Sequence, residues 1–496
     1  MSHHRCHPKH CRRVNVRTAS TSKNAWRTLG LGLGFSLGLS ACQLIQPEAM
    51  PEINVGQQIS DPAQYGLDLK SWQSKDWKVA APSASLPKGE WWQVFKDPQL
   101  NQLMQQLNRE NASIAQYEAQ YRQALSMIDQ AQSARWPSLG VTPGMSRGKT
   151  QQLGSSVTET QYSVSSTASW EPDLWGKVRQ KILVNQRQAK ASQAELNNIR
   201  LSMQAQLSST YLQWVVQSFE LKSQQKSLKN YKQTLEMTEN QYKAGTVAST
   251  AVDQAQSQYQ TTAASVTDLQ LSQVQLQHAM AMLIGQPQDQ FQLTVPRQLP
   301  ILPQIPSSIP SQILQRRPDV AAAAESMAAA NAQVGVARLA YFPDFNLAAS
   351  IGFQGGAIRQ LLSAPHLIWS VGPTLAASLF DGGLRRAQTA EAKAAYEASA
   401  ASYKQTVLGA IQNVEDQIAA QALLSKQAQQ QQTALNAALR AENSVMNQYK
   451  AGVIAYLDVM TAQNNRAEAQ SAVWTLRNRQ YQTTVGLIRA LGGKWE

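Results

Sequence analysis

The hexapeptide Asn240-Gln241-Tyr242-Lys243-Ala244-Gly245 recurs without change as Asn447-Gln448-Tyr449-Lys450-Ala451-Gly452, so that Gly452 follows Gly245 by 207 residues. In both places a long helical pattern leads into the hexapeptide and a second helical pattern leaves it. Glycine commonly closes a helix because it adopts the left-handed backbone conformation at little cost. Each copy is therefore expected to form the tip of a helical hairpin, and the chain is expected to contain two copies of one unit.

Apolar residues at every seventh position mark the helix that leads to the first tip. This helix is expected from about Lys177 to Lys243. Its heptad positions are Leu207, Trp214, Leu221, Leu228, Leu235 and Tyr242. Such spacing is typical of a coiled-coil seam, and a helix of this length extends over about 100 Å. The return helix should end near Ile284, and the second copy should have matching helices that end near Lys450 and Leu491.

Two regions, 139–170 and 344–380, replace the helical pattern with an alternation of apolar and polar residues. An alternation with period two predicts half-buried strands. It is also the pattern of membrane barrel strands, which face lipid on one side and water on the other. Each region is expected to contribute two strands, which gives four strands per chain.

Composition suggests the remaining boundaries. Residues 42–96 are rich in proline and tryptophan and are expected to form an extended N-terminal segment. The first structural repeat, 97–285, should begin with one helix from about Asp97 to Arg135, because the residue before Pro137 disfavours helix. A proline-rich linker, 286–310, leads to the second repeat, 311–496, whose first helix is expected from about Ser311 to Leu339.

Residues 1–41 have the features of a secretory signal peptide. Basic residues precede a short apolar run, Leu29 to Leu39, which is too short to span a bilayer as a mature helix. The sequence Leu39-Ser40-Ala41-Cys42 resembles a bacterial lipobox, which implies cleavage before Cys42 and acylation of that cysteine. The next residue is Gln43 and not aspartate, which resembles the sequence of lipoproteins that are passed on to the outer membrane. The alternative is an ordinary signal peptide that is followed by an unrelated cysteine.

The charge and the cysteine content exclude several classes of function. The formal net charge is +13, but seven basic residues lie in the leader; removing them from 45 leaves 38 basic against 32 acidic residues. The rest of the sequence therefore lacks the large positive charge that would indicate nucleic acid binding. Four of the six histidines and two of the three cysteines also lie in the leader, so the rest of the sequence offers no His/Cys metal cluster. We expect no cofactor and no enzymatic activity.

Four strands cannot close a barrel, and an open sheet edge in lipid leaves backbone groups without partners. Bacterial barrels begin at eight strands, so at least two chains must share one sheet, and three chains would give twelve strands. The hairpin helices would combine in the same way into a tube. Small residues on their seams and glutamines on their other faces favour a water-filled interior.

Several motifs together identify a family resemblance. They are Arg317-Pro318-Asp319-Val320, Trp170-Glu171-Pro172-Asp173-Leu174-Trp175-Gly176, Phe380-Asp381-Gly382-Gly383, the Ala-X-X-Pro sequences at 134–137 and 340–343, and the two Tyr-Lys-Ala-Gly tips. The chain resembles the TolC-type outer-membrane efflux factors, in particular the lipoprotein branch with OprM and NodT-like proteins. This resemblance implies an α+β membrane protein: a homotrimer with a twelve-stranded β-barrel in the outer membrane, continuous with a barrel of α-helical hairpins in the periplasm.

The resemblance also implies a function. The protein would be a passive duct, anchored by lipid, that exports small molecules received from an inner-membrane pump of the RND type through a periplasmic adaptor (membrane fusion) protein. Two alternatives remain from the sequence: a conduit for type I protein secretion, and a periplasmic coiled-coil scaffold lipoprotein without a pore. The alternating strands argue against the scaffold, which has no use for lipid-facing residues.

Two sets of site residues follow from the resemblance. The expected adaptor contacts are Tyr242, Lys243, Gly245, Tyr449, Lys450 and Gly452, for which the alternative is a role as plain helix caps. The expected periplasmic gate consists of Leu457, Asp458 and Thr461. Well-known members have aspartate at the position of Thr461. The first-repeat position that lies 207 residues before Asp458 is Ala251, with Asp253 two residues later. Asp458 is therefore the expected acidic residue of the pore, unless it is only a solvated surface acid.

Overall fold

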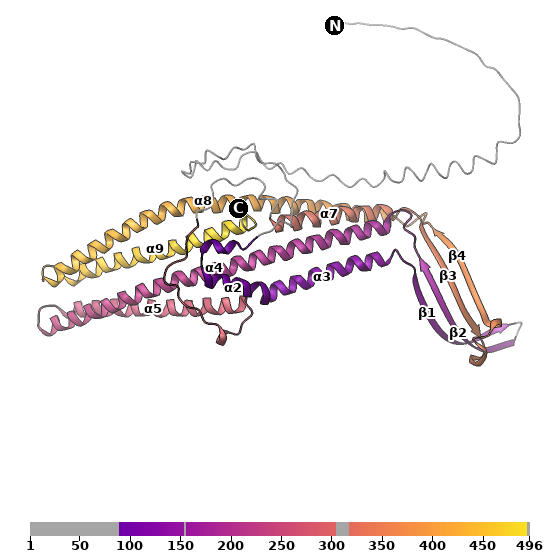
Figure 1. The fold of residues 1–496 in the computed structure, drawn as a ribbon, viewed down its shortest axis with the longest axis horizontal. Coiled ribbons are helices and arrows are strands. Elements are labelled where there is room, and N and C mark those ends of the chain that lie inside the picture. Colours follow the sequence, from indigo (N-terminus) through magenta and orange to yellow (C-terminus); the bar gives the residue numbers. More distant parts are fainter. Residues whose placement is uncertain (1–88, 153–154, 304–316, 494–496) are drawn as a thin grey trace, which may run out of the picture. The chain divides into compact units, whose positions relative to one another are not determined.

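The computed structural model describes residues 89–152, 155–303 and 317–493 (Figure 1). The predicted signal peptide, Cys42 and most of the N-terminal segment lie outside these residues. The described helices and strands follow in this order: η4 (Trp91–Phe95), α2 (Pro98–Glu110), α3 (Ala112–Ser133), β1 (Ser138–Gln152), β2 (Ser155–Trp170), α4 (Lys177–Lys243), α5 (Ser249–Leu283), η5 (Gln288–Gln290), α7 (Pro318–Leu339), β3 (Asp344–Gly355), η6 (Ile358–Gln360), η7 (Ala364–His366), β4 (Leu367–Ala376), α8 (Leu384–Lys450) and α9 (Tyr456–Ala490).

The two halves of the chain repeat each other in length as well as in sequence. Helices α4 and α8 each contain 67 residues, and helices α5 and α9 each contain 35 residues. Both hairpins predicted from the repeated hexapeptide are therefore confirmed. Gly245 and Gly452 adopt φ values of 75° and 74° at the two tips. Their amides donate to the carbonyls of Tyr242 and Tyr449, at 2.9 Å in both copies, which is the pattern of a Schellman C-cap.

The four strands form one antiparallel sheet in the order β1-β2-β3-β4. The register pairs Met145 with Tyr162, Val164 with Phe353, and Ile351 with Trp369, so these apolar residues share one face of the sheet. Strands β1 and β4 are the edges and have no second strand neighbour within the described part of the chain. The predicted alternation is confirmed, although β4 ends at Ala376 and does not continue to Leu379.

The prediction of a single helix from Asp97 to Arg135 is wrong. The chain forms two helices, α2 and α3, separated at Asn111, whose backbone is extended with ψ at 121°. The Asn111 carboxamide oxygen accepts a hydrogen bond from the Ile114 amide at 3.0 Å, and its nitrogen donates to the Leu283 carbonyl at 2.7 Å. Asparagine favours such caps over helix interiors because its side chain competes for backbone hydrogen bonds.

The described boundaries differ from the predicted ones in two further places. Trp91 and Trp92, which belong to the segment expected to be extended, lie in the short helix η4 and are 1% and 3% exposed. Helix α7 begins at Pro318 with Arg317 as its N-cap, and not near Ser311 as predicted; residues 304–316 lie outside the described ones. Proline suits the first turn of a helix because its missing N–H has no helical acceptor there.

The largest hydrophobic core lies around the middle of α4. Trp214 and Tyr211 of α4 are fully enclosed by side chains from η4, α2, α5 and α9. The Tyr211 hydroxyl donates to Asp97 Oδ2 at 2.8 Å, and Asp97 Oδ1 accepts from the Leu100 amide at the start of α2. This core therefore fastens the first helical segment to both hairpins. Within the described residues, no helix combines the length and the apolar character that crossing a membrane requires.

Acidic caps fix the passage from the sheet to the long helices in both halves. The Asp173 carboxylate accepts from the amides of Val178 and Arg179 at 2.9 and 3.0 Å at the start of α4. The Asp381 carboxylate accepts from the amides of Gly383 and Arg385 at 2.9 and 3.3 Å at the start of α8. Carboxylates are favourable at helix N-termini because they satisfy free amides and oppose the helix dipole.

Candidate functional site at the hairpin tips

The two tips expose most of the residues that were expected to contact an adaptor. Lys243, Gly245, Lys450 and Gly452 are exposed at the ends of the hairpins. The ring of Tyr242 is 50% exposed. The tips are thus accessible surfaces on which the backbone turns at glycine.

Tyr449 does not share this exposure. Only 4% of its surface is accessible, because it packs against α4 and against Tyr456, whose ring centroid lies 5.7 Å away. Its hydroxyl donates to Gln241 Oε1 at 2.7 Å and lies 3.3 Å from Thr238 Oγ1. The side chain that was expected to be available to an adaptor therefore joins the second hairpin to the first. The sequence could not reveal this, because the hexapeptide itself is identical in both copies.

The three predicted gate residues share one exposed face at the start of α9. Leu457 is 53% exposed, and Asp458 and Thr461 are also exposed. The Thr461 hydroxyl donates to the Leu457 carbonyl one turn earlier at 2.9 Å. Val459 and Gln463, on the opposite face of α9, are buried. Asp458 is thus the one charged member of this predicted set, and it points away from the packed side of its own helix.

A buried arginine further along α9 was not predicted from the sequence. Arg466 is 7% exposed, and its guanidinium donates to Ser227 Oγ at 3.0 Å and to the Tyr231 hydroxyl at 2.7 Å, both on α4. Its Nε lies 3.0 Å from Glu442 Oε2 on α8. One side chain therefore links three helices of the two hairpins.

Burial dominates the titration of the groups around Arg466. It raises the pKa of Glu442 above 4.5, and the nearby Arg466 cation partly opposes this rise. Burial also raises the pKa of the Tyr231 hydroxyl. The sequence contained a signal for this cluster, because Arg466 continues the buried stripe of α9 through Val459 and Gln463 with spacings of four and three residues. A charge on such a stripe indicates a buried ion pair.

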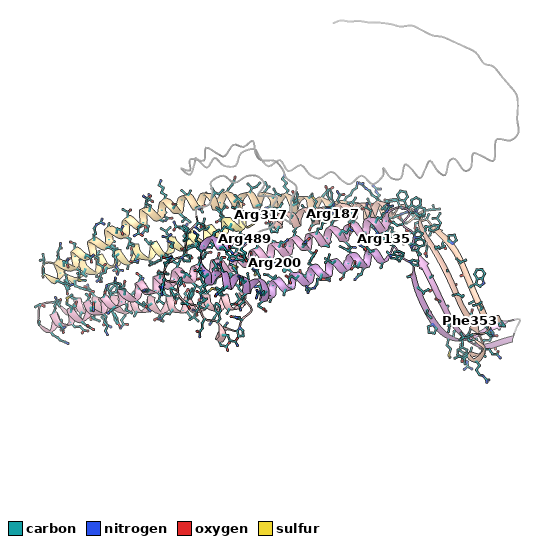
Figure 2. The ribbon with its side chains drawn as sticks, in the orientation of Figure 1. Arg135, Arg187, Arg200, Arg317, Phe353 and Arg489 are labelled. Atoms are coloured by element: carbon teal, nitrogen blue, oxygen red, sulfur yellow. The ribbon has the colours of Figure 1, made fainter. Side chains whose placement is uncertain are left out.

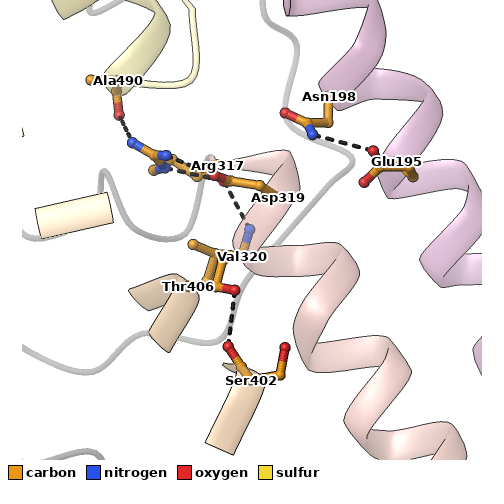
Figure 3. Close-up of polar contacts among 8 residues, drawn as sticks. All are labelled: Glu195, Asn198, Arg317, Asp319, Val320, Ser402, Thr406 and Ala490. Atoms are coloured by element: carbon orange, nitrogen blue, oxygen red, sulfur yellow. Dashed lines mark hydrogen bonds and ion pairs between the residues drawn. The ribbon is translucent and has the colours of Figure 1, made fainter. Parts of the chain in front are cut away.

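Arg317, the first residue of the predicted Arg-Pro-Asp motif, lies between the start of α7 and the end of α9 (Figure 3). Its Nη1 donates to the Ala490 carbonyl at 3.0 Å, and its Nη2 lies 2.6 Å from Asp319 Oδ2. Asp319 Oδ1 also accepts from the Val320 amide at 2.9 Å. The motif therefore caps two helix ends at once.

Other arginines connect α4 to its neighbours (Figure 2). Arg200 pairs with Glu118 of α3 at 2.9 Å, and Arg187 pairs with Glu325 of α7 at 3.0 Å. These four side chains are each at least a quarter exposed, so each pair contributes only about 0–1 kcal/mol. Each pair joins α4 to a neighbouring helix and adds little to the stability of the fold.

The sheet places most of its apolar and polar residues on opposite faces. One face carries large apolar side chains, among them Leu139, Val141, Met145, Ile351, Trp369, Val371 and Leu375. The other face carries mainly hydroxyl and glycine residues: Ser163, Ser165, Thr167, Ser169, Gly352, Ser350, Ser370, Gly372 and Thr374. Along the described strands this second face has no charged residue between Asp344 and Glu159. Such a sheet suits lipid on one side and water on the other.

Comparisons with known proteins agree with this geometry. The family model described as "Outer membrane efflux protein" matches residues 103–286 and 309–493. The chain belongs to the outer membrane efflux protein family. It is 30% identical to the pyoverdine export outer membrane protein OpmQ of Pseudomonas putida, over 94% of this chain and 97% of OpmQ. It is 28% identical to the toluene efflux pump outer membrane protein TtgC of Pseudomonas putida, over 92% of this chain and 93% of TtgC.

Among solved structures, the chain is similar to the outer-membrane channel OprN. The TM-score is 0.79 at 29% identity, and the match covers 92% of this chain and all of OprN. The predicted fold class is thus confirmed: helical hairpins that continue into a strand domain, shared in a trimer. The prediction of an outer-membrane efflux channel that is not an enzyme is also confirmed by family membership. Other pump components are its partners, as they are for its relatives.

Proposed function

We propose that this protein is the passive outer-membrane duct of a tripartite efflux system, which exports small molecules delivered by an RND-type inner-membrane pump through a periplasmic adaptor. The single observation that carries the proposal is the four-stranded sheet, with an apolar face, a polar face without charge between Asp344 and Glu159, and two edges that are open within the described residues. A sheet edge cannot remain unpaired in lipid. Three sheets joined edge to edge form a wall whose polar faces surround water.

The preference for small molecules rests on the relatives, whose names refer to pyoverdine export and toluene efflux. Deletion of this gene from its own bacterium should raise the cellular accumulation of a fluorescent pump substrate such as ethidium, and a plasmid copy should restore export. Unchanged accumulation, together with loss of a protein from the culture medium, would instead favour a conduit for type I protein secretion. The purified protein should also be a trimer that conducts ions across a planar bilayer.

The anchor proposed for the mature chain is an acylated Cys42, which lies outside the described residues. Acyl chains hold a protein at a membrane when more than one signal contributes, and here the strands would provide the second. Replacing Cys42 by serine should abolish incorporation of radiolabelled palmitate. The control is Cys11→Ser, which changes a cysteine of the leader and should leave the label in place.

For the gate, we propose that Asp458 of each protomer lies near the axis of the duct. The exposed position of Asp458 on α9 supports this, as does its separation from the packed face that holds Val459. Neighbouring carboxylates repel one another and attract cations, which is a common arrangement in selective pores. Leu457 and Thr461 would narrow the same level, with the threonine hydroxyl already bonded within its own helix.

The proposed adaptor contacts are the exposed ends of the hairpins: Lys243, Gly245, Lys450 and Gly452. Each glycine leaves the backbone open, since a Cβ atom added to it would meet no atom within 4 Å. Replacing either glycine by a larger residue would strain the positive φ and obstruct a partner. Both effects should weaken cross-linking to the adaptor in cells, whereas Lys243→Arg should preserve it.

A further inference from the structure

The two identical tips differ in what packs against their tyrosines. Tyr242 and Tyr449 occupy the same place in the repeated hexapeptide, and the backbone at Gly245 and Gly452 agrees to within one degree of φ. Yet Tyr242 is 50% exposed and Tyr449 is 4% exposed. The hexapeptide and its backbone are the same, so the difference lies in what packs on each tyrosine: Tyr449 meets α4 and also Tyr456 of its own hairpin, whose counterpart in the first repeat is Ser249.

The surroundings of Tyr449 have a counterpart in the other half of the repeat. Tyr449 is covered by Thr238 and Gln241 of α4, and its hydroxyl donates to Gln241 Oε1. The residues that follow these two by 207 positions are Val445 and Gln448 of α8. The second copy therefore keeps the amide acceptor, as Gln448, and has Val445, an apolar residue of the same shape, in place of Thr238. Gln448 is exposed and Val445 is half-buried in the single chain.

The helix pairing that would bring these residues to Tyr242 is missing within one protomer. Helix α4 packs against α9, which joins the first helix of one hairpin to the second helix of the other. The equivalent pairing of α8 with α5 is not made to a comparable extent within the described part of the chain. In Figure 1, α5 and α8 lie on the two outer sides of the hairpin pair. A second copy of the chain can complete the pattern on either side.

We propose that Tyr242 packs against α8 of the neighbouring protomer, where its hydroxyl donates to Oε1 of that protomer's Gln448 and its ring contacts that protomer's Val445. The proposal rests on the trimeric channel fold and deepens it by naming the residues that join the protomers at the tips. The end of the duct is then a ring in which contacts of Tyr449 within a protomer alternate with contacts of Tyr242 between protomers.

The proposed contact between protomers has fewer polar and charged side chains than the contact within a protomer. Inside the protomer, Arg466 adds hydrogen bonds to Ser227 and Tyr231. At the equivalent positions the repeat has Tyr259 in place of Arg466, with Ala434 and Ala438 in place of Ser227 and Tyr231. No charged side chain takes part at these three positions. Among the positions compared, the polar groups of the joint between protomers are then the hydroxyls of Tyr242 and Tyr259 and the amide of Gln448.

The test is a pair of double-cysteine variants of the full-length protein in its own outer membrane. The first is Tyr242→Cys with Gln448→Cys, and the matched control is Tyr449→Cys with Gln241→Cys. Leader cleavage before Cys42 would leave that cysteine as the only native one, blocked by acylation. The reagent is a short bis-maleimide, because residues that meet through long side chains stand too far apart for a disulfide. The products are separated by denaturing electrophoresis after heating.

The first pair should give covalent dimers and trimers, whereas the control pair should give an internally linked monomer of altered mobility. The single variants Tyr242→Cys and Gln448→Cys should give neither product. An internally linked monomer from the first pair, or a dimer yield no greater than that of the single variants, would overturn the proposal. If trimers form but positions 242 and 448 do not cross-link, the proposed contact of Tyr242 is wrong and the trimeric duct still stands. If the unmodified protein forms no trimer, the proposed trimeric duct itself is wrong.

Discussion

Arg466 of α9 and Tyr231 of α4 are joined by a 2.7 Å hydrogen bond from Nη2 to the hydroxyl oxygen, although they are 235 residues apart in the sequence. The same guanidinium lies 3.0 Å from the Glu442 carboxylate of α8. The two hairpins of a protomer are thus joined by a buried charge in addition to apolar packing. The ion pair lies within the second hairpin, whereas the two hydrogen bonds to α4 exist only while the hairpins stay together.

Replacing Arg466 by alanine should destabilise the helical part of the protein. The change leaves Glu442 with an uncompensated buried charge and removes two hydrogen bonds, so we expect a loss on the order of 3 kcal/mol in the free energy of unfolding. Thermal unfolding followed by circular dichroism measures this loss. Arg479→Ala, which removes an exposed arginine from the same helix, is the control. Equal midpoints for the two variants would contradict the role of Arg466.

The raised pKa of Glu442 predicts a pH dependence with a definite sign. Because burial raises this pKa above 4.5, the folded protein holds the proton more tightly than the unfolded chain does. The resulting stabilisation is complete below pH 4.5 and is lost as the pH rises through the folded value. Glu442→Gln removes this loss, so the stability of the variant relative to the wild type should increase from pH 4.5 to pH 7.5.

The measurement is urea unfolding at several pH values between these limits, with Glu468→Gln as the control for an exposed glutamate on α9. The control should follow the wild type at every pH. A stability difference between Glu442→Gln and the wild type that does not change with pH would show that folding does not raise the pKa of Glu442.

Removing the proposed gate carboxylate should change conduction. Asp458→Ala in a planar bilayer should raise the single-channel conductance or reduce the preference for cations, because it removes one negative charge per protomer from the axis. Thr461→Asp should have the opposite effect on cation preference. Asp253→Ala, an exposed acid of the first tip, is the matched control. If conductance and ion preference stay unchanged in Asp458→Ala, Asp458 has no part in the gate.

Arginine substitutions at two adjacent residues of β4 test which face of the sheet is in contact with lipid. Val371→Arg places a charge on the apolar face and should destabilise the membrane-embedded trimer by about 2–4 kcal/mol near the middle of the bilayer. Gly372→Arg places the same charge on the polar face, where an added Cβ would meet no atom within 4 Å. The first variant should assemble poorly on a heat-shift gel, whereas the second should assemble and lose cation preference. The reverse result would invert the assignment of faces.

Removing the Arg317 side chain should lower the stability of the protein without changing its ion conductance. Arg317→Ala frees the Ala490 carbonyl and leaves Asp319 without its cation, so a loss of about 3 kcal/mol in stability is expected. Arg489→Ala, which removes an exposed arginine beside the same carbonyl, should cost much less. Trimers of Arg317→Ala that still form should conduct normally, and an altered conductance would indicate a role in the pore.

Much of the fold could be predicted from the sequence because the information is local and repeated. The heptad positions define α4, the glycine caps define the ends of α4 and α8, and the alternation in 162–170 and 345–353 defines strands whose faces the structure confirms. The break at Asn111 was missed although its cap on the Ile114 amide is local; its second partner, the Leu283 carbonyl, is 172 residues away in the sequence. Local patterns carry no information about such a partner.

The candidate site was less predictable for the same reason. The two copies of the hexapeptide are identical, so nothing within them distinguishes the exposed Tyr242 from the buried Tyr449. The distinction arises from Tyr456 of the same hairpin and from Thr238 and Gln241 of α4, which meet Tyr449 only after the hairpins pack. Arg466 belongs to the same category, since its partners lie on two other helices.

The uncharged polar face of the sheet has a consequence for sorting. A solute that has reached the strand section meets hydroxyl groups and bare backbone, and between Asp344 and Glu159 it meets neither an attractive nor a repulsive ion. Anionic and cationic cargo of equal size should traverse this section at equal rates. Any discrimination by the sign of the charge must then take place outside this section, before Asp344 or from Glu159 onward.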